Sequence, residues 1–231
     1  MKTDATKPSK NDLAYGAIKK MIVTNQLKPG LLVNESLLAE TLGMSRTPIR
    51  EAIGTLCREG FLSSSDGGGV CVKSPTVKDI YDLGEVSLAL ETLALKSAVH
   101  HIPPEKIDAL RIAWQEARQV LAAEGGGEAM TERLLELDSQ TYDLIIDHAD
   151  NRIVPQIYEN VRLKLQWFRR MIVSTIENDI NSIDAHLDIL NQIQAGDVQG
   201  AEQTIKNYNN TSLQLLLDYG KFTVYEMPIW R

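Results

Sequence analysis

Two arginines four residues apart, Arg46 and Arg50, are the side chains of this sequence with the most specific chemical potential. Residues i and i+4 of a helix share one face, so both guanidinium groups would project in the same direction. An arginine can donate two hydrogen bonds to one guanine, and the first turns of a helix in the major groove face the base edges. Ser45 and Thr47 add hydroxyl groups for phosphate or base at the same end. The pattern indicates a surface that reads double-stranded DNA, although both arginines could also be ordinary surface charges.

The segment that carries these arginines has the hydrophobic spacing of three helices. The first is predicted over residues 11–25. A second, short helix begins after the capping residue Asn34 and stops at Gly43. Ser45 then caps a third helix, which has Pro48 in its first turn, where a missing N–H costs least. Two helices joined by a tight glycine turn predict a helix-turn-helix.

A short β-hairpin is predicted after the third helix. Residues 61–62 and 70–72 are apolar or β-forming, and a polar run followed by the glycines 67–69 separates them. A hairpin in this position would be the wing of a winged helix.

The charge of the chain divides near Pro75. Residues 1–76 hold 10 Lys and Arg against 7 Asp and Glu, whereas residues 77–231 hold 14 against 24. A basic module is therefore joined to a larger acidic one. No stretch approaches the roughly 18 apolar residues of a membrane span, and the polar N-terminus resembles no signal peptide. We expect a cytoplasmic protein without a membrane partner.

The acidic module has helical periodicity throughout and no convincing alternating strand. Six helices are predicted, over residues 77–101, 104–124, 128–149, 151–174, 180–195 and 197–219. Six helices without a sheet form a bundle. The predicted fold is therefore mainly α, with a winged helix-turn-helix domain over residues 1–76 and an all-helical domain for effector binding and dimerisation over residues 77–231.

The first module resembles the DNA-binding domain of GntR-family transcriptional regulators. The resemblance rests on residues 27–30, 35–40 and 44–53, the last of which read Met-Ser-Arg-Thr-Pro-Ile-Arg-Glu-Ala-Ile. Two positions depart from the family pattern: Ser36 replaces an arginine that touches the DNA backbone in many relatives, and Asp66 puts an acid in the wing. The resemblance implies DNA contacts at Ser45, Arg46, Thr47, Arg50 and Gly67.

The second module resembles the FCD-type ligand-binding domain of the FadR subfamily. In many such domains one aspartate and three histidines hold a divalent metal that binds the carboxylate of a small acid. Here Asp138 and His186 match that pattern, but Tyr142 and Tyr208 stand where histidines are expected. Ser87 replaces an arginine that clamps the acid in many relatives. Neutral tyrosine seldom ligates zinc or nickel at pH 7, so we predict no bound metal, with a divalent metal at the degenerate site as the alternative.

These polar residues lie on helices that otherwise turn apolar faces inward. They could satisfy each other by hydrogen bonds in the core, or they could form a pocket that binds a ligand directly. Arg162 and Arg169 are seven residues apart on one helix face, and they could clamp an anionic ligand or remain solvated surface charges. The predicted effector-binding residues are Ser87, Asp138, Tyr142, Arg162, His186 and Tyr208.

The resemblance implies a homodimeric regulator, in which two winged helices bind a palindromic operator and the helical domains sense a small organic or sugar acid. Repression relieved by the acid is the commonest logic of the family. One alternative is a constitutive DNA-binding regulator with a decayed effector pocket. Another is a helical metal-dependent enzyme that uses Asp138 and His186, but no activated nucleophile or acid–base pair accompanies them at a readable spacing. We therefore predict that the chain is not an enzyme.

Overall fold

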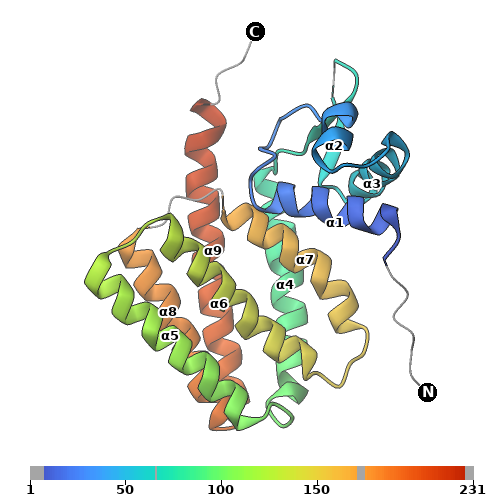
Figure 1. Ribbon diagram of the computed structural model, residues 1–231. Helices are drawn as coiled ribbons and strands as arrows, with labels where there is room; N and C mark the ends of the chain where they lie inside the picture. Colours follow the sequence, from blue (N-terminus) through green and yellow to red (C-terminus); the bar gives the residue numbers. More distant parts are fainter. Residues whose placement is uncertain (1–7, 66, 171–174, 227–231) are drawn as a thin grey trace, which may run out of the picture. The chain divides into compact units, whose positions relative to one another are not determined.

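A computed structural model describes residues 8–65, 67–170 and 175–226. The chain separates into two compact units, Met1–Thr76 and Val77–Arg231, each with its own internal contacts (Figure 1). Each unit is described by itself below.

The first unit is a winged helix-turn-helix, as the sequence predicts. Its elements are α1 (Lys10–Val23), α2 (Glu35–Thr41), α3 (Arg46–Arg58), β1 (Leu62–Ser64) and β2 (Val70–Val72). Helix α1 packs along α3, and α2 packs on α3 from another side. The position of α3 is therefore fixed by both neighbouring helices.

Local capping explains where these helices begin and end. Ser9 and Asp12 form a capping box at the start of α1, and the Asn34 side chain accepts hydrogen bonds from the first turn of α2. Helix α1 ends two residues before the predicted boundary. Asn25 has φ +61°, a left-handed conformation that cannot continue a right-handed helix.

The wing is an antiparallel pair of three-residue strands. Leu62 lies opposite Val72, and the turn between the strands contains Gly68 and Gly69 at φ +82° and +97°. Only glycine adopts these angles without strain, which explains the glycine run. Asp66, expected to oppose phosphate at the wing, lies outside the described residues.

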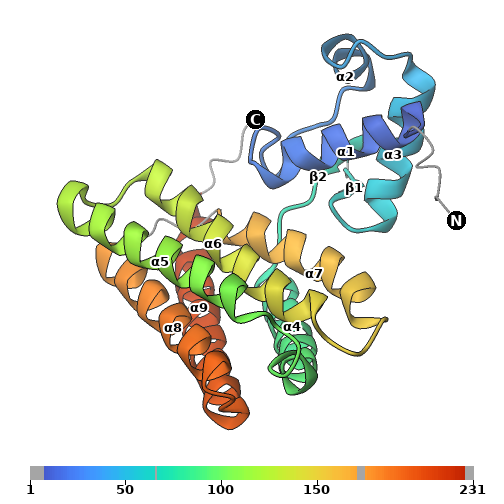
Figure 2. The ribbon, with the colours of Figure 1, turned by 60° about the horizontal axis from the view of Figure 1, so that its bottom comes forward.

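The second unit is all-helical in its described part (Figure 2). Its helices are α4 (Val77–Ala98), α5 (Pro104–Glu124), α6 (Glu128–Asp147), α7 (Val154–Arg169), α8 (Ile176–Gln194) and α9 (Val198–Glu226). Helix α6 packs against α4, α5, α7 and α8, while α9 packs against α4 and α8. A side chain on the inner face of α6 can therefore meet residues from most of the bundle.

Several helix ends differ from the predicted ones. Helix α8 begins four residues early because the Thr175 hydroxyl caps it by accepting from the backbone of Asn178. Helix α9 continues to Glu226, and α7 ends at Arg169, so that the predicted helical residues 171–174 lie outside the described part of the chain. None of the helices in the described ranges is long and apolar enough to cross a membrane.

The core of this unit combines apolar and polar side chains. Trp114, Leu137, Ile145 and Ile183 are fully buried. The same interior holds the buried polar side chains Ser87, Glu91, Asp138, Ser139, Thr141, Asp179, His186 and Asn209. Buried polar groups are costly unless they are paired, so their partners define the candidate site.

Candidate functional site

The predicted DNA-binding side chains lie together at the start of α3. Ser45, Arg46, Thr47 and Arg50 are all exposed. Ser45 occupies the N-cap position, but its hydroxyl makes no capping hydrogen bond. The third helical residue is Pro48, which has no N–H to donate to a cap. The Ser45 hydroxyl is therefore left for an outside partner such as phosphate, and Gly67 is likewise exposed in the wing turn.

The two arginines differ in what they contact. The Arg50 Nη2 atom lies 2.9 Å from Glu35 Oε2, and its Nε also donates to the Glu35 carboxylate. No ion pair within the described ranges involves Arg46. Arg46 can thus bind a base without breaking an ion pair. Arg50 must first release the Glu35 carboxylate before its guanidinium can bind DNA.

A part-buried polar triad connects α1 with the end of α3. The Tyr15 hydroxyl donates to the Glu59 carboxylate at 2.8 Å, and the Lys19 ammonium lies 3.0 Å from the same carboxylate. Lys19 also donates to the Tyr15 oxygen at 2.6 Å. Sequence reasoning missed this triad, although the spacing of four between Tyr15 and Lys19 on α1 was a usable signal.

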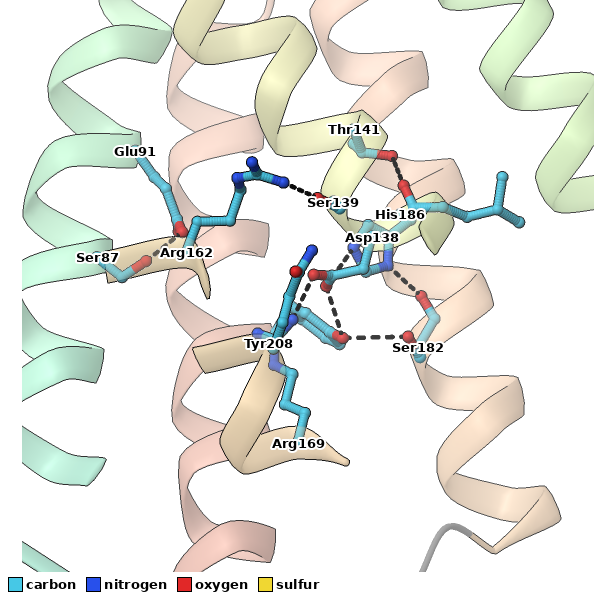
Figure 3. Close-up of polar contacts among 12 residues, drawn as sticks. Ser87, Glu91, Asp138, Ser139, Thr141, Arg162, Arg169, Ser182, His186 and Tyr208 are labelled. Atoms are coloured by element: carbon cyan, nitrogen blue, oxygen red, sulfur yellow. Dashed lines mark hydrogen bonds and ion pairs between the residues drawn. The ribbon is translucent and has the colours of Figure 1, made fainter. Parts of the chain in front are cut away.

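Asp138 on α6 is the centre of a buried polar cluster in the second unit (Figure 3). Its Oδ1 atom lies 3.1 Å from His186 Nε2 and accepts a hydrogen bond of 3.2 Å from the Tyr208 hydroxyl. Its Oδ2 atom forms an ion pair with Arg169 at the end of α7. The structure thus unites three of the predicted effector residues with Arg169, which is not a solvated surface charge because its side chain is only 16% exposed.

Both ring nitrogens of His186 lie within hydrogen-bond distance of an oxygen atom. Its Nδ1 lies 2.7 Å from the backbone carbonyl oxygen of Ser182, an acceptor only, and its Nε2 faces the Asp138 carboxylate. Trp114 stacks on the ring at a centroid distance of 4.3 Å and fixes its plane. Ser182 was missed at the sequence level, although it precedes His186 by four residues on α8.

Charge and burial set the protonation of this cluster. Burial raises the pKa of Asp138, but Arg169 and the hydrogen bonds from His186 and Tyr208 outweigh burial and lower it to about 2. Burial raises the pKa of Tyr208 to about 12 and that of Tyr142 well above its ordinary value. Asp138 is therefore a carboxylate at neutral pH, and both phenols keep their protons.

This donor set does not fit the divalent metal of the related domains. Both ring nitrogens of His186 already face oxygen atoms, a guanidinium occupies one oxygen of Asp138, and Tyr142 and Tyr208 are protonated phenols. Nowhere in the described ranges do three or more His, Cys, Asp or Glu side chains gather as a metal-binding group. That the protein binds no metal stays a prediction.

A cavity of about 120 Å³ adjoins the cluster. Asp138, Arg169 and Tyr208 form part of its wall, and Leu134, Leu135 and Leu215 supply apolar surface. The rest of the wall carries hydroxyl, amide and carboxylate groups from Thr131, Asn178, Asp179, Asn181, Ser182, Thr211 and Ser212. An apolar cavity with convergent polar groups is typical of a small-molecule site.

The other predicted effector residues lie behind this wall. The Ser87 hydroxyl donates to Glu91 at 2.6 Å, and Tyr142 borders a second space of only about 10 Å³, about the size of one water. Arg162 also borders that space, where it donates to Ser139 at 2.7 Å and lies 3.2 Å from Asp143. Their roles in effector binding remain predictions.

Glu91 is a buried acid on α4. It is 4% exposed, and its Oε1 accepts from Ser87 and from Tyr158 at 3.0 Å. Its Oε2 is buried without a partner in the described part of the chain. Burial raises the pKa of Glu91, despite hydrogen bonds from Ser87 and Tyr158 and the charge of Arg169 that lower it.

This raised pKa predicts a pH-dependent stability. Above the unfolded pKa of about 4.3, the folded chain keeps a proton that the unfolded chain releases, so Glu91 lowers stability as pH rises toward its folded pKa. We expect Glu91→Gln to gain stability relative to the original protein between pH 5 and pH 8. Urea unfolding at both pH values measures the difference, and a gap that is constant or shrinks with pH would contradict the prediction.

Comparisons with known proteins match both units. Residues 11–72 match the family "Bacterial regulatory proteins, gntR family", and residues 82–210 match the FCD domain. The HTH-type transcriptional regulator YdhC of Bacillus subtilis is 28% identical over 211 residues, 90% of this chain and 92% of that protein. A probable D-xylose utilization operon transcriptional repressor of Paenarthrobacter nicotinovorans is 26% identical over 81% of this chain and 80% of its own length.

Solved structures agree on the fold. Escherichia coli McbR/YncC superposes with a TM-score of 0.75 at 20% identity, covering 95% of this chain and 100% of that chain. The fold and the comparisons together define a bacterial transcriptional regulator and not an enzyme. The chain belongs to the GntR family, with an FCD domain as its helical unit.

Proposed function

We propose that this protein is a ligand-responsive regulator whose operator binding changes when a small organic or sugar acid occupies the cavity beside Asp138. The supporting observation is that cavity, whose wall is formed by a guanidinium and several residues with hydroxyl groups. A ligand shifts DNA binding only if it binds the DNA-competent and incompetent arrangements with different affinity. Repression relieved by the acid is the proposed direction, supported by the relative named as a repressor.

The active form proposed is a cytoplasmic homodimer on a palindromic operator. Helices α4 and α7 pack against each other and both expose large apolar side chains. Leu93 on α4 is 47% exposed, Ile153 at the N-cap of α7 is 57% exposed, and Ile157 on α7 is 49% exposed. A second copy of this chain would remove such surface from water.

One experiment tests sensing and DNA binding together. Purified protein is screened by thermal shift against sugar acids, hydroxy acids, dicarboxylates and amino acids, with chelator and again with zinc. A ligand at about 100 times its Kd should add about 2.7 kcal/mol of stability. Each hit is then titrated into the complex with an operator selected from random duplex DNA, and fluorescence anisotropy follows release.

We expect an acid that stabilises the protein to lower its operator affinity at least fivefold. Light scattering of the DNA complex should give two chains per operator. Stabilisation without any change in operator affinity would overturn the proposal and favour a constitutive regulator.

A further inference from the structure

We infer that the Arg169 guanidinium binds the acid group of the effector directly. The inference rests on the proposed function, since it concerns the same cavity, and it names the chemistry of the ligand as a small monocarboxylate that carries hydroxyl groups.

Arg169 has the donors for this role. Arg169 lines the cavity, and within the described ranges its guanidinium donates a hydrogen bond to Asp138. A guanidinium has five N–H donors in a fixed fork, so donors remain for a second carboxylate. Its Cζ lies 5.8 Å from the centroid of the Tyr208 ring, which together with Asp138 holds the group in place. The site is therefore positioned before any ligand arrives.

Among the residues that line the cavity, Arg169 is the cationic side chain, and Asp138 and Asp179 are the acids. The Asp138 carboxylate already contacts Arg169, His186 and Tyr208, and Asp179 is buried and already partnered. A carboxylate of the ligand would therefore bind at the Arg169 guanidinium, and the two acids in the wall would repel a second acid group on the ligand.

The size and lining of the cavity restrict the ligand further. A protein cavity of about 150 Å³ holds benzene, so about 120 Å³ fits a ligand of about six non-hydrogen atoms. Ser182, Thr211 and Ser212 present hydroxyl groups to it, and Asn178 and Asn181 present amides. Hydroxyl groups on the ligand would find both donors and acceptors there, whereas a fully apolar acid would leave the wall unpaired.

Glycolate is a suitable probe, because it carries one carboxylate and one hydroxyl group. Glycolamide is its neutral counterpart and malonate its doubly charged one. Each is titrated at constant ionic strength with EDTA, and binding is read as the shift in Tm and by calorimetry. We expect glycolate to bind and to stabilise the full chain, with glycolamide and malonate at least tenfold weaker.

Variants assign the binding to Arg169. Arg169→Gln should weaken glycolate at least tenfold, and Arg169→Lys should retain part of the affinity. Arg170→Gln is the matched control, because Arg170 is 15% exposed, forms an ion pair with Glu132 and does not border the cavity. If Arg169→Gln does not fold, the double variant Asp138→Asn with Arg169→Gln removes both charges and makes the same comparison possible.

Three results would overturn the inference: glycolate that binds only with added zinc, glycolate that binds Arg169→Gln as well as the original protein, or no binding of glycolate at 100 mM. Failure of the proposed function can be told apart from failure of this inference, because release of the operator is measured in a separate experiment. Glycolate that binds through Arg169 without releasing the operator would leave this inference standing and remove only the regulatory role.

Discussion

Replacing Asp138 with alanine is expected to lower the free energy of unfolding of the FCD domain by about 3–5 kcal/mol. The substitution leaves the Arg169 guanidinium buried without its carboxylate and removes the carboxylate oxygen that His186 Nε2 faces. It also removes the acceptor of the Tyr208 hydroxyl. Breaking a buried ion pair from one side costs far more than an exposed pair is worth, because the remaining charge stays uncompensated. Urea unfolding at pH 7 followed by circular dichroism measures the change.

Asp143→Ala is the matched control on the same helix. Its side chain is 38% exposed and pairs with Arg162 at 3.2 Å, so its loss should cost less than about 1 kcal/mol. Equal losses in the free energy of unfolding for the two variants would mean that the buried Asp138 carboxylate contributes no more to stability than the more exposed Asp143. A second signature is acid sensitivity: because the pKa of Asp138 is lowered to about 2, its contribution is present above pH 4 and is lost as pH falls toward 2. Asp138→Ala should lack this component.

The sequence predicted the DNA-binding unit almost completely because its signals are local. Capping residues, a proline in a first turn and a glycine turn each act within a few residues, and the structure shows the predicted helices and hairpin. Ser45 is an instructive exception, since it sits at the cap position without a capping bond. The reason was also local: Pro48 removes the N–H that the hydroxyl would have bonded.

The effector site was only partly predictable, because it depends on packing between helices. The resemblance to FCD-type domains pointed to Asp138, His186 and Tyr208, and the structure places His186 and Tyr208 within hydrogen-bond distance of Asp138. Spacing could not decide whether Arg169 faces water or the interior, since that depends on how α7 packs against α6. Nor could it show that both nitrogens of His186 meet acceptors, which is a matter of side-chain geometry in three dimensions.

The second large effect is a loss of operator affinity, expected when Arg46 at the start of α3 is replaced. Arg46→Ala should weaken operator binding by about 1–3 kcal/mol and relax the base preference at one position of each half-site. Arg46 is exposed at the first residue of α3 and has no ion pair within the described ranges, so nothing has to be broken before it meets a guanine. Binding of the variant to operator duplexes with every base at that position measures both effects. An equal loss on all sequences would make Arg46 a phosphate contact instead.

Arg50 should behave differently, because the free protein already satisfies it. Glu35→Gln removes the carboxylate 2.9 Å from Arg50 and deletes a negative charge beside the DNA surface, so operator affinity should rise. Arg50→Ala should lose less than Arg46→Ala, since part of its interaction with DNA replaces the one with Glu35. Arg58→Ala, at the opposite end of α3, controls for general loss of positive charge and should change affinity little. If Glu35→Gln weakens binding, the pair with Arg50 orients the arginine for DNA and does not compete with it.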